Sequence, residues 1–260
     1  MKKRSPAALI LLAAAALAAF LLRPAAVDYN AVRVKAVIDG DTIVLSNNQK
    51  VRYIGLDTPE IFLKTETAFE YAPKPFAEAA KEFNRKMVEG KVVRLEFDIE
   101  RKDKYRRLLV YCFLDGEMVN AQLLRNGLAM LYTQVPNIKY VDLLVKAQQE
   151  AREDGLNLWT PERIIPAEKA GEYIGELASV EGRVLKVKST SSAVYLNFGR
   201  DYRTDFSVVI FKDDLRLFNE RKIDLEKDYR NRLVRVSGLI KEYHGPEIIV
   251  RHPAQMEIIE

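Results

Sequence analysis

The order of the expected secondary structure elements constrains the fold of this chain more than any other feature. Three strand candidates precede a helix, two more strands follow it, and two further helices end the series. These segments are, in order, residues 31–37, 42–45, 50–56, 75–90, 92–98, 108–114, 119–127 and 140–154. Asp39-Gly40 and Ser46-Asn47-Asn48 are turn signals between the first strands. A sheet with one helix between its strands predicts a small domain of mixed α and β structure.

A second β-rich unit follows the first. Pro161 and Pro166 predict a linker at residues 163–170. Beyond it, strand candidates and one helix (213–226) occupy residues 180–184, 194–198, 206–211, 233–240 and 247–250. We therefore predict a mainly β chain with helices (α+β). A five-stranded barrel of the OB type would span residues 30–162, and a second OB-like barrel would span residues 171–260.

The N-terminus has the pattern of a secretory signal. Lys2, Lys3 and Arg4 precede an unbroken apolar run at residues 7–22. Sixteen residues are fewer than the about 20 that a spanning helix needs. Residues 1–26 are therefore expected to be a signal peptide or a membrane anchor, and the protein to be secreted or anchored outside the cytoplasm.

Composition excludes attraction of nucleic acid by net charge, an internal disulfide, and a metal site built from cysteine and histidine. The formal charge of +4 comes from Lys2, Lys3, Arg4 and Arg23, because removing these four from 41 basic residues leaves 37, equal to the 37 acidic ones. Net charge therefore cannot attract phosphate, and local clusters must do so. The single cysteine, Cys112, excludes an internal disulfide and is expected in the core. With one cysteine and two histidines, metal chemistry must use oxygen ligands.

Carboxylates stand at the ends of adjacent strand candidates. Asp41 and Asp57 can converge there and offer two hard oxygen ligands to Ca²⁺. Glu60 follows Asp57 closely enough to hold a water molecule beside the ion. Arg52 is an odd number of positions before Asp57, so a regular strand would place it on the opposite face. A bend near Gly55 would correct this, and the sequence leaves the point open.

A basic turn supplies a second arginine. Arg107 ends the segment Asp103-Lys104-Tyr105-Arg106-Arg107. Guanidinium groups bind phosphate oxygens through two donors at once. Two arginines, a divalent cation and a carboxylate beside water are the minimum set for phosphodiester hydrolysis.

These segments resemble the signature of the staphylococcal nuclease family. The resemblance runs in order through residues 37–42, 52–60, 86–89, 103–107, 119–120, 125–129 and 156–159. It covers about half of the chain, residues 32–162. Each motif is moderately specific, and their conserved order makes the set specific.

The resemblance implies a role for each matching residue. It implies calcium binding by Asp41, Asp57 and the Thr58 carbonyl, with Asp39 as a nearby acid. It implies catalysis by Arg52, Glu60 and Arg107, with Glu60 as the base or water-orienting group. It implies that Lys104 and Tyr105 contact a terminal phosphate. Family members cleave the 5′ P–O bond of DNA and RNA and leave 3′-phosphates.

Two positions depart from the family pattern. Arg106 stands where the family commonly has glycine. The stacking aromatics of the family fall in a segment that aligns poorly here, where only Tyr132 can bind a base.

Two further interpretations remain open on sequence. The chain could instead be a non-catalytic nucleic-acid-binding or cell-surface protein built from two OB modules. The second unit could bind bases through aromatic side chains, namely Tyr195, Phe198, Phe206 and Phe211, or these could be core residues. No obligate protein partner is evident, and the expected partner is a DNA or RNA substrate.

Overall fold

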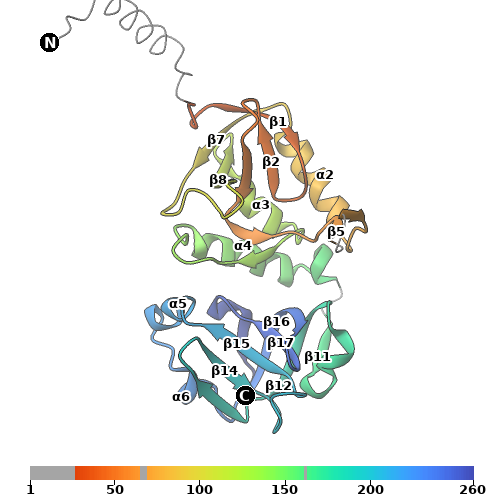
Figure 1. Ribbon diagram of the computed structural model, residues 1–260, viewed down its shortest axis with the longest axis vertical. Helices are drawn as coiled ribbons and strands as arrows, with labels where there is room; N and C mark the ends of the chain where they lie inside the picture. Colours follow the sequence, from red (N-terminus) through yellow and green to blue (C-terminus); the bar gives the residue numbers. More distant parts are fainter. Residues whose placement is uncertain (1–26, 65–68, 161–162) are drawn as a thin grey trace, which may run out of the picture.

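The computed structural model describes residues 27–64, 69–160 and 163–260, which form two lobes (Figure 1). The predicted signal or anchor segment, residues 1–26, lies outside this part of the chain. In the part that is described, no helix is both long and apolar enough to cross a membrane.

The N-terminal lobe contains a closed five-stranded barrel. Its strands are β1 (Val32–Val37), β2 (Thr42–Leu45), β3 (Lys50–Tyr53), β7 (Val92–Glu96) and β8 (Leu108–Leu114). β1, β2 and β3 form an antiparallel meander, and β1 also pairs with β7, which pairs with β8. β8 then pairs with β3 in parallel and closes the sheet. This order confirms the predicted OB-type barrel.

Helices and short strands complete this lobe. They are β4 (Gly55–Asp57), β5 (Phe62–Lys64), β6 (Phe69–Tyr71), α2 (Ala77–Val88), β9 (Glu117–Met118), α3 (Val119–Arg125), β10 (Met130–Tyr132), α4 (Val141–Glu153) and the 3₁₀ turn η1 (Asn157–Trp159). The three helices match the predicted segments. The β5–β6 pair between β4 and α2 was not predicted, because each of its strands has only three residues. β10, which pairs with β4, was also missed because three residues are too few for a periodic signal.

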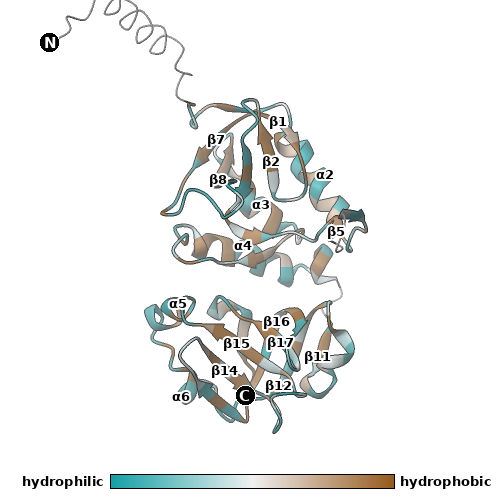
Figure 2. Ribbon diagram, viewed as in Figure 1, coloured by the Kyte–Doolittle hydropathy of each residue, from teal (hydrophilic) through white to brown (hydrophobic). Residues whose placement is uncertain are grey.

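Alternation along the strands builds the core of this lobe. Val34, Ile43, Leu45 and Val51 are fully buried, and α2 and α3 cover the barrel. Hydrophobic colouring accordingly concentrates on the strands, and the loops are hydrophilic (Figure 2). Cys112 is buried on β8, as expected for a core thiol, and burial raises its pKa to about 12.

The C-terminal lobe repeats the same strand order. Its strands are β11 (Ile164–Pro166), β12 (Leu177–Arg183), β13 (Lys186–Ser189), β14 (Ala193–Asn197), β15 (Ser207–Phe211), β16 (Leu233–Glu242), β17 (Pro246–Ile249) and β18 (Met256–Ile258). The sheet runs β12-β16-β17-β15-β14-β13, with β15 and β17 parallel. Only two residues separate β12 from β13, so nearly continuous chain forms both ends of this path. The result is an OB-like barrel.

Two expectations for this lobe were wrong in detail, and two short elements were not predicted. Residues 163–170 are no linker, because β11 pairs with β12, and Ile165, Ala167 and Ala170 belong to the second core. The predicted helix at residues 213–226 is two short helices, α5 (Leu215–Glu220) and α6 (Leu225–Tyr229). Two further 3₁₀ turns, η2 (Ala167–Tyr173) and η3 (Pro253–Gln255), were not predicted.

The aromatic residues proposed for base stacking divide into two groups. Phe198 and Phe206 are buried and pack edge to face, with ring centroids 5.0 Å apart. They are core residues and cannot stack on a base. Phe211, for which a core position had seemed at least as good an interpretation, is 39% exposed at the end of β15.

Candidate active site

Two turns bring Asp41 and Thr58 together at one end of the N-terminal barrel. Asp41 directly precedes β2, and Thr58 directly follows β4. A Cβ atom on Gly40 would lie 2.6 Å from Thr58 Cγ2, so only glycine permits this approach. The Asp-Gly-Asp sequence is therefore more than a turn signal, because it lets two chain segments touch.

Asp41 is held in one orientation by hydroxyl and backbone donors. The Thr58 backbone N–H and the Thr58 hydroxyl both donate to Asp41 Oδ2 at 3.0 Å. The Thr42 hydroxyl donates to Asp41 Oδ1 at 3.1 Å. Asp41 is only 5% exposed, so the carboxylate is preorganised by its surroundings and not by solvent.

A bend at Gly55 places Arg52 on the same side as Asp57. The strand breaks between β3 and β4, where Gly55 adopts a φ of +85°. The Arg52 Nη2 atom then lies 2.5 Å from Asp57 Oδ1, and Nη1 forms an ion pair with Asp41. The structure thus supplies the bend that the sequence left open.

The charges around Arg52 do not balance. Burial of the guanidinium opposes its charge, but Asp41, Asp57, Asp39 and Glu60 outweigh burial and raise the pKa of Arg52. Desolvation raises the pKa of Asp57 to about 6, with Asp41 and Glu60 adding to the rise and Arg52 opposing it. Burial and the neighbouring Asp41 carboxylate also raise the pKa of Asp39. Four acids around one cation leave the site negative.

This local charge fits a divalent cation bound by oxygen. Asp41, Asp57 and the Thr58 carbonyl would supply two carboxylates and one backbone oxygen, which are donors that hard cations prefer. No group of three or more acidic, histidine or cysteine side chains is arranged to hold a metal in the described residues. The proposed set needs only two such side chains, because its third donor is a carbonyl. Arg52 bridges the two carboxylates.

Glu60 lies at the exposed edge of this cluster. It is three residues past the end of β4, and its carboxylate is exposed to solvent. Its negative charge contributes to the raised pKa of both Arg52 and Asp57. Its role beside a water molecule stays a prediction.

Arg107 ends the turn that leads into β8, the strand that pairs in parallel with β3. It directly precedes Leu108, which pairs with Val51 across the parallel β3–β8 ladder. Asp103 orients it, because Arg107 Nε donates to Asp103 Oδ2 at 2.6 Å. The backbone N–H groups of Tyr105 and Arg107 also donate to Asp103, each at 2.9 Å. Arg106, where the family has glycine, keeps a positive φ of 66° in this turn.

Lys104 and Tyr105 gather next to Arg107. The Tyr105 ring is 69% exposed and lies 5.6 Å from the Arg107 guanidinium carbon. The Lys104 Nζ atom is 5.1 Å from the same ring. The turn therefore presents two cations and one aromatic to solvent, a combination that suits a phosphate and its sugar.

Tyr132 is placed differently from the expectation. The guanidinium carbon of Arg251, from the C-terminal lobe, lies 4.6 Å from the centre of its ring. A base therefore cannot stack on that face of Tyr132. No sequence pattern predicts this contact of Arg251, because the neighbouring hydrogen bond, from Thr133 to Arg251, joins residues 118 positions apart.

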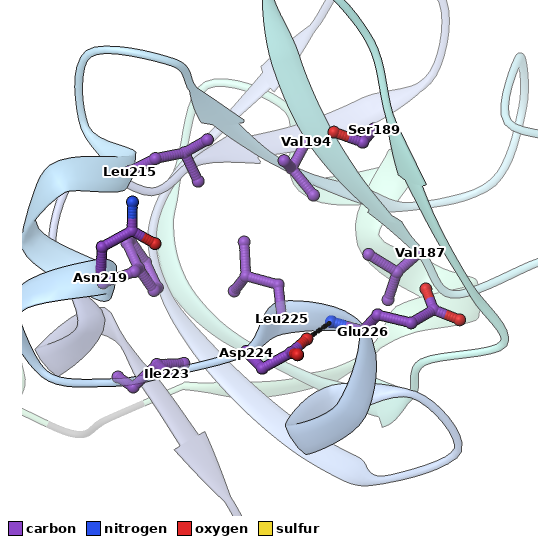
Figure 3. A pocket seen from close by; sticks show the side chains of 10 residues that line it. Val187, Ser189, Val194, Leu215, Asn219, Ile223, Asp224, Leu225 and Glu226 are labelled. Atoms are coloured by element: carbon purple, nitrogen blue, oxygen red, sulfur yellow. Dashed lines mark hydrogen bonds between the residues drawn. The ribbon is translucent and has the colours of Figure 1, made fainter.

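A hollow in the C-terminal lobe is not part of this site. It has a volume of about 380 Å³ and lies between β13, β14, α5 and α6 (Figure 3). Leu215, Val194 and Leu225 line it with other apolar side chains. Its acid Asp224 caps α6 by accepting from the backbone N–H groups of Glu226 and Lys227. None of its lining residues belongs to the acid and arginine set.

Sequence comparisons agree with this geometry. Residues 50–161 match the family described as staphylococcal nuclease homologue. The thermonuclease of Staphylococcus intermedius is 44% identical over 129 residues, which are 48% of this chain and 74% of that protein. The thermonuclease of Staphylococcus hyicus is 37% identical over 131 residues, 49% of this chain and 75% of that protein. Endonuclease YncB of Bacillus subtilis is 40% identical over 134 residues, 50% of this chain and 61% of that protein.

Proposed function

The chain belongs to the staphylococcal nuclease family and hydrolyses phosphodiester bonds, and we propose that it does so in DNA, RNA or both as an exported, calcium-dependent endonuclease. The arrangement that carries this proposal is Arg52 between Asp41 and Asp57, with Arg107 directly before β8, which pairs with the strand of Arg52. The same set would serve no purpose in a protein that only binds nucleic acid.

Each residue then has a chemical task. Asp41, Asp57 and the Thr58 carbonyl would hold the cation, which when bound would neutralise charge on the phosphate. Asp39 contributes negative charge behind them and accepts a hydrogen bond from the Asp41 backbone N–H at 3.1 Å. Oxygen-only donors favour Ca²⁺ over softer metals.

The arginines and Glu60 act on the phosphate and the water. Arg52 and Arg107 bind the non-bridging phosphate oxygens, where charge grows in the transition state. Glu60 orients the attacking water and accepts its proton. The water oxygen bonds to phosphorus as the 5′ P–O bond breaks. The 5′ oxygen leaves with the bonding electron pair and takes a proton from solvent water. The family resemblance implies this polarity, with a 3′-phosphate as product.

A cleavage assay on the purified chain tests this function. Single-stranded DNA, duplex DNA and RNA are each incubated with Ca²⁺ or with chelator. We expect cleavage in Ca²⁺ only and loss of activity in Asp57→Asn. Turnover should fall about 100-fold in Arg52→Lys, because lysine keeps the positive charge and loses the two N–H donors with which a guanidinium binds one phosphate. Full activity of Asp57→Asn in chelator would refute the metal assignment.

We also propose export. The support is the basic segment and apolar run in residues 1–26, which lie outside the described structure. Fractionation of cells that express the full chain, with N-terminal sequencing of the recovered protein, separates cleavage from anchoring. Recovery of the intact chain in the cytosol would contradict export.

A further inference from the structure

The C-terminal lobe contacts the N-terminal lobe close to the candidate active site. The Thr133 hydroxyl donates to the Arg251 carbonyl at 3.0 Å, and the Arg251 guanidinium covers Tyr132. A second contact, between Arg221 after α5 and Asp142 in α4, joins the two lobes where α5 lies below α4 (Figure 1). The lobes are therefore docked by specific side chains.

Arg251 is itself held firmly. Its backbone N–H donates to Gln255 Oε1 at 2.9 Å, and its Nη1 atom lies 3.4 Å from Asp214 Oδ2. The Asp214 side chain is only 3% exposed. Arg251 thus connects the second core to Tyr132.

The docking point lies on the ladder that carries Asp57. Tyr132 pairs with Gly55, and Met130 pairs with Asp57 across β10 and β4. Two residues along a strand correspond to about 7 Å. The C-terminal lobe therefore reaches the N-terminal lobe within a short distance of a predicted metal ligand.

The β16–β17 hairpin starts from this docking point. β17 ends two residues before Arg251, and its first half pairs with the tip of β16, where Lys241 faces Glu247. Lys241 and His244 are exposed, and Tyr243 is 69% exposed, with its ring 4.6 Å from that of His244. Glu247, opposite Lys241, is four residues before Arg251, so about 13 Å of strand separates the hairpin tip from the contact on Tyr132. The positive charge of Lys241 also opposes the rise in the pKa of Asp57 that desolvation causes.

We propose that the β16–β17 hairpin forms one wall of the nucleic-acid groove, with Lys241 binding a backbone phosphate and Tyr243 stacking on a base beside the scissile bond. This inference rests on the proposed nuclease function. It assigns to the C-terminal lobe a role in substrate binding at the active site itself, in place of a separate binding surface on its buried aromatics.

The chemistry of the hairpin suits this role. Lys241 is exposed, and within the described ranges its ammonium forms no direct ion pair, although Glu247 lies opposite it and feels its charge. A phosphate can therefore approach the ammonium from solvent. An exposed tyrosine stacks on any base, which suits an enzyme without sequence preference. The hairpin would also provide an aromatic that the poorly matching segment around Tyr132 lacks.

Point variants of the full chain test the proposal on a single-stranded DNA oligonucleotide. We expect Lys241→Gln to raise KM about fivefold, to leave kcat within about twofold, and to reduce the salt dependence of binding by about one counterion. Lys241→Arg should restore both values. Tyr243→Ala should raise KM about 10-fold. Anisotropy titrations in chelator, where no cleavage occurs, should show the same order of affinities.

Lys186→Gln is the matched control. Lys186 is an exposed lysine on β13, at the other end of the sheet path, and its loss should change neither KM nor the salt dependence. If wild type cleaves and Lys241→Gln and Tyr243→Ala both behave like Lys186→Gln, the hairpin role is refuted while the nuclease function stands. If wild type neither cleaves nor binds the oligonucleotide, the proposed nuclease function is refuted, and the hairpin proposal, which rests on it, is refuted as well.

Discussion

The two barrels of this chain share a strand order and differ in what they place on it. In each, a meander is closed by a parallel pair, β3 with β8 in the first and β15 with β17 in the second. The middle of the first pair carries Arg52, which bridges two carboxylates. The middle of the second carries Val208, which is fully buried.

The comparison shows that one strand order can carry different side chains, and that the side chains and not the fold determine the chemistry. The C-terminal barrel does have an acid and arginine pair, Arg235 with Glu181, at 2.9 Å. That pair lies on the ladder between β12 and β16. A second carboxylate, Glu257 at 3.7 Å, comes from β18 in the same sheet and not from a turn at the end of the barrel. Four predictions test how far the two barrels differ.

The largest effect is expected at Glu60. Glu60→Gln should lower kcat by about 10²–10⁴-fold and change KM little, because a base acts mainly in the transition state. Glu181→Gln is the counterpart in the C-terminal barrel and should leave kcat unchanged. Steady-state kinetics on one oligonucleotide measures both. A change in KM alone would reassign Glu60 to substrate or metal binding.

A second difference concerns the aromatics of the C-terminal barrel. Phe206→Ala should lower the free energy of unfolding by about 3–5 kcal/mol, because Phe206 is 1% exposed in the core. Phe211→Ala should cost less than about 1 kcal/mol, because Phe211 is 39% exposed. Urea unfolding of the full chain measures both changes. Equal losses would show that Phe211 also packs in the core.

A third prediction uses the buried His252, whose Nδ1 accepts from the Ala254 N–H. Burial, with Arg221 adding and Asp142 opposing, lowers its pKa to about 4. The folded state therefore keeps His252 neutral. Its contribution is present above the ordinary pKa of about 6.5 and is lost as pH falls toward 4. Between pH 7.5 and pH 5 we expect a loss of about 2 kcal/mol.

A matched variant isolates this contribution. Asp214 titrates in the opposite sense, because burial raises its pKa to about 6 and its protonation favours the folded state as pH falls. His252→Asn keeps an acceptor for the Ala254 N–H and removes the titration. The stability of wild type relative to His252→Asn should therefore decline with falling pH. A constant difference between the two proteins would contradict the low pKa.

The smallest effect is expected in the Arg107 turn. Arg106 has a φ of 66°, a region that costs a residue with a side chain about 1–2 kcal/mol. Arg106→Gly should raise the free energy of unfolding by about 0.5–1 kcal/mol, after the entropy cost of glycine. Asn48→Gly, at a φ of 65° that asparagine tolerates, should change it less. Thermal unfolding compares the two, and a loss in Arg106→Gly would show that the arginine side chain stabilises the turn.

The sequence alone determined the element order and the composition of the site. Alternation with a period of two and helical spacing predicted the barrel strands, α2, α3 and α4, because both patterns are local. The family resemblance, now confirmed by the comparisons, named Asp41, Arg52, Asp57, Glu60 and Arg107 before any geometry was known.

The tertiary structure decided what depends on distant contacts. It placed Arg52 beside Asp57 through the bend at Gly55, where a Cβ atom would lie 2.3 Å from Leu144 Cδ1. It moved residues 164–166 from a linker into the second sheet. It put Arg251 of the C-terminal lobe on Tyr132 and bonded its carbonyl to Thr133. These contacts join segments far apart in the chain, and their free energy comes from packing that no local pattern encodes.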